Sequence, residues 1–202
     1  MRFAKDNGAC GVFMRPIEGA KLVDDPYFYP VYELAASWDW PIGLHQANGN
    51  AGLVEFFAGH RGGREFFNQY RIFNVGAFFL VIQSGLTAMF PGLKIGFIET
   101  AASWIPWVTM ELRARKHLLA RGLSEDFLED YQLFVTCQTG DDVPYLLHCG
   151  YGNHLMIGTD YGHVDSSTEL DSLHKLTEKQ EISAEALQKI AEANARVFYG
   201  LN

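Results

Sequence analysis

One repeated pattern limits what this chain can fold into: a short apolar run ends in a polar residue, and a loop and a helical segment follow. Runs of about four to six apolar or small residues, bounded by turn signals, are typical of strands buried on both faces of a sheet. The runs, each with the polar residue that ends it, are Cys10–Met14 before Arg15, Pro41–Leu44 before His45, Leu93–Ile98 before Glu99, Leu133–Cys137 before Gln138, and Leu155–Thr159 before Asp160.

Helical segments separate these runs. They are predicted at Tyr29–Ser37, at Arg64–Phe90 as one helix or two, after a capping Ser103 with Pro106 in the first turn, and at Ser183–Phe198 with Gly200 as the C-terminal cap. Strands that alternate with helices predict a parallel sheet joined by right-handed crossovers.

Two α/β architectures have this alternation, an open doubly wound sheet and a closed (β/α)-barrel of the TIM type, and both place function at the carboxyl ends of the strands. A complete barrel has eight strands in about 250 residues. The sequence shows five strands, so we expect one domain over residues 1–202, a barrel that lacks about three strand–helix units at its front. The open side of such a barrel should expose apolar surface.

Composition narrows the functional classes. The formal net charge of −8 argues against nucleic acid or an anionic membrane as the main partner. The apolar stretch Phe73–Phe90 approaches the length of a membrane span, but polar residues and glycines interrupt it, which favours a buried helix. The three cysteines have no metal-site spacing, which indicates a reducing, cytoplasmic compartment.

The residues at the strand ends would converge on one mouth in a parallel barrel. A neutral imidazole from His45 and a carboxylate from Asp160 suit a borderline divalent ion such as Zn²⁺. The same pair could also be an acid–base couple without metal. In the alternative interpretation, these polar residues simply mark where each buried run stops, as the residues taken singly lead us to expect for Gln138 and Arg15.

A resemblance covers nearly the whole chain. The segment Gly-Thr-Asp-Tyr-Gly-His, which ends at His163, resembles the last-strand motif Gly-(Ser/Thr)-Asp-Tyr-(Pro/Gly)-His of the amidohydrolase-related family. This family includes aminocarboxymuconate semialdehyde decarboxylase and related aromatic-acid decarboxylases. Other stretches resemble the family's fourth, fifth and sixth strands and its closing helix, in the same order: Gly8–Arg15, Tyr29–Glu33 with Pro41–His45, Phe90–Trp104, and Lys189–Leu201.

The resemblance implies roles for particular residues. His45 matches the metal-ligating histidine of the fifth strand, and Asp160 matches the last-strand aspartate that contacts the metal or the water it activates. Asp160 would then exchange a proton during the reaction. Arg15 would hold a substrate carboxylate in a bidentate pair, with a structural salt bridge as the alternative. His163 would contact the substrate or support a ligand.

Two departures from the family pattern affect this assignment. The chain contains no His-X-His motif, which supplies two further ligands on the family's first strand, and it lacks the histidine that many members carry near the sixth strand. Glu99 stands at the sixth-strand end and is expected to act there as a base or a hydrogen-bond anchor. Trp104 follows this strand end and is a candidate for substrate contact, although a core position is the alternative.

The sequence therefore predicts a metal-dependent hydrolase or carboxy-lyase that acts on a small carboxylated or cyclic substrate, with a divalent cation, most simply zinc, as cofactor. Homo-oligomers are possible. Two other functions stay open: a non-catalytic remnant that serves as a binding or oligomerisation module, and an open-sheet hydrolase without metal.

Overall fold

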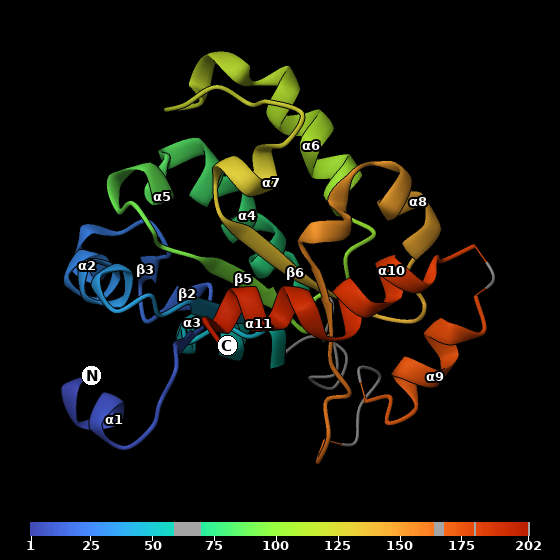
Figure 1. Cartoon of the computed structure of the whole chain (residues 1–202). Coiled ribbons are helices and arrows are strands. Elements are labelled where there is room, and N and C mark those ends of the chain that lie inside the picture. Colours follow the sequence, from blue (N-terminus) through green and yellow to red (C-terminus); the bar gives the residue numbers. More distant parts are fainter. Residues whose placement is uncertain (59–69, 164–167, 180, 202) are drawn as a thin grey trace.

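The computed structural model describes residues 1–58, 70–163, 168–179 and 181–201. Its core is a five-stranded sheet, with a separate two-stranded hairpin beside it (Figure 1). The strands of the sheet are β1 (Val12–Met14), β4 (Ile42–His45), β5 (Ile95–Ile98), β6 (Leu133–Cys137) and β7 (Leu155–Ile157). The hairpin consists of β2 (Ile17–Glu18) and β3 (Lys21–Leu22).

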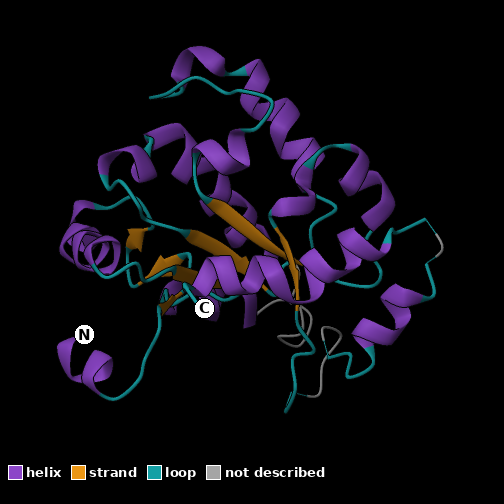
Figure 2. Ribbon diagram, viewed as in Figure 1, coloured by secondary structure: helices purple, strands orange, loops and turns teal. Residues whose placement is uncertain are grey.

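The strands of the sheet lie side by side in chain order, and every neighbouring pair is parallel (Figure 2). A doubly wound sheet would instead reverse its strand order at a switch point. Because each crossover advances in the same direction, the sheet has the order of a barrel sector. The predicted fold class, a (β/α)-barrel with about five of its eight strands present, is confirmed, and so are the five predicted strands.

Helices connect and cover the strands. They are α1 (Arg2–Asp6), α2 (Tyr29–Ser37), α3 (Ala51–Ala58), α4 (Ile72–Ser84), α5 (Leu86–Met89), α6 (Ile105–Ala114), α7 (Phe127–Asp130), α8 (Val143–His148), α9 (Ser172–Thr177), α10 (Ala184–Gln188) and α11 (Asn194–Tyr199). A π-helical stretch, Lys189–Ala193, joins α10 to α11 into one rod. Within the described residues, no helix is both long and apolar enough to cross a membrane.

The outer face of the sheet, defined here as the face toward α4 and α6, carries the larger part of the core. Phe97 of β5 packs edge-on against Phe78 of α4 at a ring distance of 5.0 Å, and Phe78 in turn meets Trp104 at 4.9 Å. These apolar contacts hold the helices that follow β4 and β5 against the sheet, so the core fixes where both strand ends lie.

The inner face, defined here by Gly43, Gly96, Phe134 and Met156, is covered in part by the last helix. Phe198 of α11 is fully buried in a small cluster with Phe134 and Met156. Figure 1 shows α11 running across the sheet on the side opposite α4. The last helix thus buries part of this face, whereas Phe13, the register partner of Gly43 on the edge strand β1, is 67% exposed, which agrees with the expected exposure of apolar surface on the open side.

Some predicted helix boundaries were wrong, and each has a local reason. Ser103 does not cap α6. Its hydroxyl donates to Asp141 at 2.6 Å, and the helix begins two residues later with Pro106 in its first turn. The predicted cap Ser183 does accept a hydrogen bond, from the backbone N–H of Ala186, and Gly200 ends α11 with a φ of 63°. The predicted helical segment Arg64–Phe90 contains α4 and α5, while residues 64–69 lie outside the described chain.

Candidate active site

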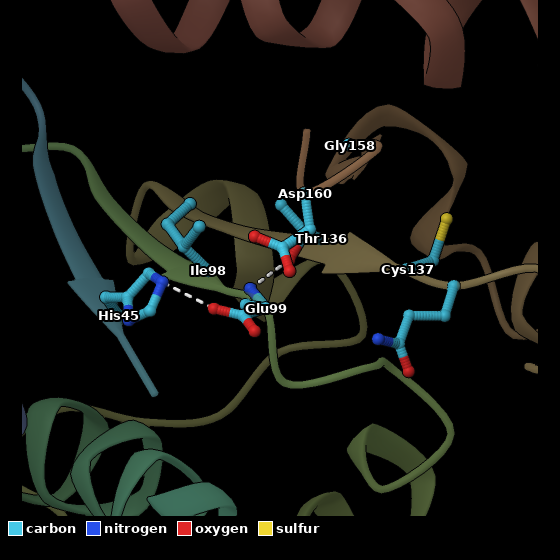
Figure 3. A pocket seen from close by; sticks show the side chains of 8 residues that line it. His45, Ile98, Glu99, Thr136, Cys137, Gly158 and Asp160 are labelled. Carbon is cyan, nitrogen blue, oxygen red and sulfur yellow. Dashed lines mark hydrogen bonds and ion pairs between the residues drawn. The ribbon is translucent and has the colours of Figure 1, made fainter. Parts of the chain in front are cut away.

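A cavity of roughly 90 Å³ opens at the carboxyl ends of β4 to β7 (Figure 3). His45, Glu99 and Asp160 point into it from three different strand ends, as the parallel order of the strands requires. The rest of its lining is Ile98, Thr136, Cys137, Gln138 and Gly158. Four of the five predicted strand-end residues therefore meet in one place.

His45 and Glu99 form the central pair of this cavity. The Nε2 atom of His45 contacts the Oε2 atom of Glu99 directly (Figure 3), and the other ring nitrogen, Nδ1, lies 3.0 Å from the backbone oxygen of Gln46. Since a carbonyl oxygen only accepts, Nδ1 is the donor. The hydrogen bond with Glu99 raises the pKa of His45, and partial burial opposes that rise.

Glu99 is held from several directions. Its backbone N–H donates to the Thr136 hydroxyl at 2.7 Å, and Gln46 Nε2 donates to its Oε1 at 2.5 Å. Glu99 also has a left-handed backbone, with a φ of 63° that is uncommon for a residue with a side chain. Such strained conformations persist only where the surroundings over-determine them, and they cluster at functional sites.

Asp160 stands on the other side of the cavity and shares this backbone conformation, with a φ of 50°. Its Oδ1 lies 3.0 Å from Nδ1 of His163, and its Oδ2 accepts from the Thr168 hydroxyl at 3.1 Å. The turn after β7 thus brings His163 back beside the aspartate three residues before it.

The donor set fits a divalent cation. One ligand atom each from Glu99, Asp160 and His163 lies within 4.8 Å of the others. Ligands that bind one ion at about 2.1 Å are at most about 4.2 Å apart, so a shift of some tenths of an ångström would close the set. His45 adds a second imidazole next to Glu99. His45 itself lies outside this group of three, whose carboxylate and imidazole donors suit a divalent ion.

Cys137 lines the cavity but has the surroundings of a core residue rather than those of a reactive thiol. Its side chain is buried, and this burial raises the pKa of the thiol to about 12. The thiolate is the reactive form of cysteine, and it is almost absent at neutral pH when the pKa is this high.

Three of the predicted site residues do not line this cavity. His163 reaches it through its contact with Asp160, and the other two are Arg15 and Trp104. Arg15 forms a bidentate ion pair with Glu18, with Nη2 2.6 Å from Oε2, which is the structural salt bridge that the sequence left as its alternative. Trp104 packs on Phe78 and Phe97 of the core and lines a second pocket next to the first. Neither residue contacts His45 or Asp160 in this arrangement, and their substrate roles stay predictions.

Three further residues shape the site and were missed by the sequence analysis. Gln46 reaches Glu99, as described above. Arg71 donates from Nε to Gln46 Oε1 and from Nη2 to Gln138 Oε1, both at 3.3 Å. The amide nitrogen of Asn74, in α4, donates to the backbone oxygen of Leu44 at 2.9 Å. Only the position of Gln46, next to a predicted ligand, could have indicated such a role.

Several solved structures share this fold. An amidohydrolase from Mycobacterium avium subsp. paratuberculosis matches all of this chain at 19% identity, with a TM-score of 0.74. A 5-carboxyvanillate decarboxylase from Sphingomonas paucimobilis also matches all of it, at 17% identity and a TM-score of 0.71. The corresponding enzyme from Novosphingobium aromaticivorans, complexed with manganese and a nitrobenzoic acid, matches 99% of the chain at 17% identity and a TM-score of 0.76.

The chain spans only part of the length of these proteins, namely 53%, 61% and 59% of them in the order given. Among curated proteins, none matches the chain. The family model described as amidohydrolase matches residues 1–201, which is nearly every residue. Together with the strand order and the position of the cavity, this match shows that the chain belongs to the amidohydrolase family.

Proposed function

We propose that this protein is part of a metal-dependent hydrolase or carboxy-lyase that acts on a small carboxylated or cyclic substrate. The observation that carries the proposal is the convergence of His45, Glu99 and Asp160 on one cavity at the strand ends. Solved structures of the same fold support the substrate class, because they include decarboxylases of 5-carboxyvanillate and of 2,6-dihydroxybenzoate.

We propose His45 and Asp160 as metal ligands, with Glu99 and His163 near enough to join them. A divalent ion held there would polarise a substrate oxygen and stabilise negative charge as it develops. Zinc agrees best with the imidazole and carboxylate donors, and manganese is the ion named with related structures. We therefore propose zinc as the first ion to test and manganese as the second.

Side chains of this protein would donate and accept the proton during the reaction. Asp160 is the proposed group that exchanges a proton with the reacting molecule, and Glu99 is the second candidate. Gln46 and Thr136 fix the position of Glu99, so its carboxylate needs little reorganisation. His163, beside Asp160, is a proposed substrate contact, and Arg15 is a second one, which would have to exchange its partner Glu18 for a substrate carboxylate. The three free cysteines support a reducing, cytoplasmic location as a further proposal.

Metal binding by the chain tests the proposed centre directly. We expect isothermal titration with Zn²⁺ to show one site per chain, and replacing a ligand by His45→Ala or Asp160→Asn to weaken it at least about tenfold. His117→Ala is the matched control, because His117 is exposed and far along the chain from any proposed ligand. Equal zinc affinity in all four proteins would show that the ion binds elsewhere or only weakly and non-specifically.

Turnover tests the chemistry. Incubation with 5-carboxyvanillate and 2,6-dihydroxybenzoate in the presence of Zn²⁺ or Mn²⁺ should release carbon dioxide if the chain is active. Removing the basic group by Asp160→Asn should then lower the rate about 10²–10⁴-fold, while Glu99→Gln gives the same comparison for the second candidate. If Asp160→Asn keeps its rate with a full metal site, the proton-transfer role passes to Glu99. Metal binding without turnover would favour a binding module.

A further inference from the structure

A cavity of about 270 Å³ lies at the amino ends of β6 and β7, which is the end of the sheet opposite the candidate active site. We call it the amino-end cavity. The helix α7, which stands at the start of β6, forms one wall (Figure 1). Its polar lining consists mainly of three carboxylates and one imidazole, from Glu125, Asp126, Glu129 and His154. Its volume is close to the lower end of the range for small-molecule pockets, about 300 Å³.

His154 is the buried polar group that faces this cavity. Its side chain is only 8% exposed, and its Nδ1 lies 2.9 Å from the backbone oxygen of Leu133. Since a carbonyl oxygen only accepts, Nδ1 is the donor. Burial lowers the pKa of His154, so at neutral pH the ring carries a single proton and its Nε2 keeps a lone pair.

The lone pair on Nε2 has a carboxylate as its neighbour rather than a donor. The Oε2 atom of Glu129 lies 3.4 Å from it, and both atoms accept hydrogen bonds. A buried polar atom without a suitable partner is uncommon in native proteins, and each case calls for an explanation, such as a role in binding a ligand. A ligand that carries N–H groups would satisfy Nε2 and the Glu129 carboxylate together.

The amino-end cavity also carries negative charge that the protein does not neutralise. Arg113 pairs with Glu125 at 2.7 Å. Asp126 and Glu129, in contrast, have no lysine or arginine within ion-pair distance among the residues that the structure describes. Two carboxylates of the lining are therefore available to a cation.

The spacing of the acceptors favours an organic cation over a metal ion. Within the described part of the chain, one group of three ligand atoms is close enough for a single ion, and it is that of Glu99, Asp160 and His163 at the other end of the sheet. An ammonium group has three N–H donors, which can reach separate acceptors. Leu128 and Tyr151 are buried and give the cavity an apolar wall, which suits methylene groups.

We propose that the amino-end cavity binds a short aliphatic diamine, with one ammonium group on His154 Nε2 and Glu129 and the other on Asp126. The two ammonium groups match the two carboxylates that have no cation, and the methylene chain between them lies against the apolar wall. This site goes beyond the proposed function, because none of its residues lines the active-site cavity.

The probe for this site is 1,4-diaminobutane, with 1-aminobutane as its singly charged counterpart and 1,4-butanediol as its neutral one. Calorimetric titration of the metal-free chain at neutral pH should show one saturable site for the diamine. The monoamine should bind about tenfold more weakly, because one charged hydrogen-bonding group is lost, and the diol should not bind measurably. Added salt should weaken diamine binding, since the attraction is between charges.

Two variants test the residues that hold the diamine. Glu129→Gln removes a charge from a side chain that is 66% exposed, so the fold should tolerate it, and the affinity should fall about 5- to 10-fold. His154→Asn can keep the hydrogen bond to the Leu133 oxygen through its amide nitrogen but offers no atom at the position of Nε2, so the affinity should fall about tenfold. Glu185→Gln is the matched control, because this carboxylate is similarly exposed but lies on α10, where it pairs with Lys189.

The outcomes separate this site from the proposed metal centre. Circular dichroism shows whether each variant is folded, and if His154→Asn is not, Glu129→Gln decides alone. The proposal is overturned if the diamine does not bind, if the diol binds equally well, or if Glu129→Gln binds the diamine like the control. Asp160→Asn should leave diamine binding unchanged, and a loss in this variant alone would place the diamine on the active-site carboxylates. Zinc titration reports on the other end of the sheet, so either proposal can fail while the other stands.

Discussion

At the scale of single residues, Asp141 connects two of the loops around the active site. Its buried carboxylate accepts hydrogen bonds from the backbone N–H groups of Ala102, Ser103 and Gln138, at 3.0, 2.9 and 2.8 Å, and from the Ser103 hydroxyl. One carboxylate thus joins the loop after β5 to the loop after β6. The positions of Glu99 and Gln138 both depend on these loops.

Removal of this carboxylate should destabilise the fold. In Asp141→Ala, three backbone donors would lose their acceptor in a region where water has little access, so the free energy of unfolding should fall by roughly 2–4 kcal/mol. Urea denaturation followed by circular dichroism measures the difference. Asp6→Ala, on the exposed helix α1, is the control and should stay within about 0.5 kcal/mol of the unchanged chain. If the free energy of unfolding falls as little as in the control, the backbone N–H groups of these loops have other acceptors.

Only those site residues that belong to a local sequence pattern could be predicted. His45, Glu99 and Asp160 each end a buried apolar run, and parallel strands bring such ends together, so their convergence could be inferred from the sequence. The part played by Arg71 could not be. It bridges glutamines that lie 25 and 67 residues away along the chain, and nothing in its sequence neighbourhood marks that contact.

At the scale of elements, the contact between β5 and α11 explains a glycine in the middle of a buried strand. A Cβ atom on Gly96 would clash with the ring of Phe198, with Cε2 at 2.9 Å. Lys94 also binds α11 near this contact. Its ammonium donates to the backbone oxygen of Val197 at 3.1 Å and pairs with Asp39. The last helix therefore sits close against the inner face only because β5 has no side chain there.

Gly96→Ala should disturb this packing. Overpacking a tight core typically costs about 1–3 kcal/mol, and the methyl group here has no room unless the Phe198 ring moves. Gly43→Ala is a matched control, because Gly43 is the register partner of Gly96 on β4 and its Cβ would meet Ile98 at an ordinary 3.6 Å. Thermal unfolding of both variants compares them, and equal melting temperatures would contradict the tight contact.

The sequence predicted elements better than it predicted what they pack against. All five strands could be predicted, since the length of each apolar run and the turn residues that flank it are local features of the sequence. The start of α6 was wrong because Ser103 has a stronger partner in Asp141, which lies 38 residues away. The covering of the inner face by α11 depends on a long-range match between Phe198 and Gly96, which no local periodicity contains.

At the scale of the whole molecule, the sheet ends in two strands that have a neighbour on one side only within the described residues. These are β1 and β7. A strand edge presents unpaired N–H and C=O groups, which can pair with a second chain. On β1 the side chain of Phe13 is 67% exposed and lies beside the His45 ring, with the ring centres 4.8 Å apart. An apolar side chain on an open edge favours association.

We therefore predict that the purified chain self-associates as its concentration rises, and that Phe13→Lys reduces this association. A lysine on an edge strand opposes pairing because its charge would have to leave water in the contact. Phe3→Lys is the matched control, since Phe3 is 81% exposed but lies on α1 rather than on a strand edge. Sedimentation velocity over a range of concentrations measures the change. Two results would contradict the prediction: an unchanged chain that stays monomeric at every concentration, or a Phe3→Lys variant that suppresses association equally. In either case the β1 edge is not the surface through which the chains associate.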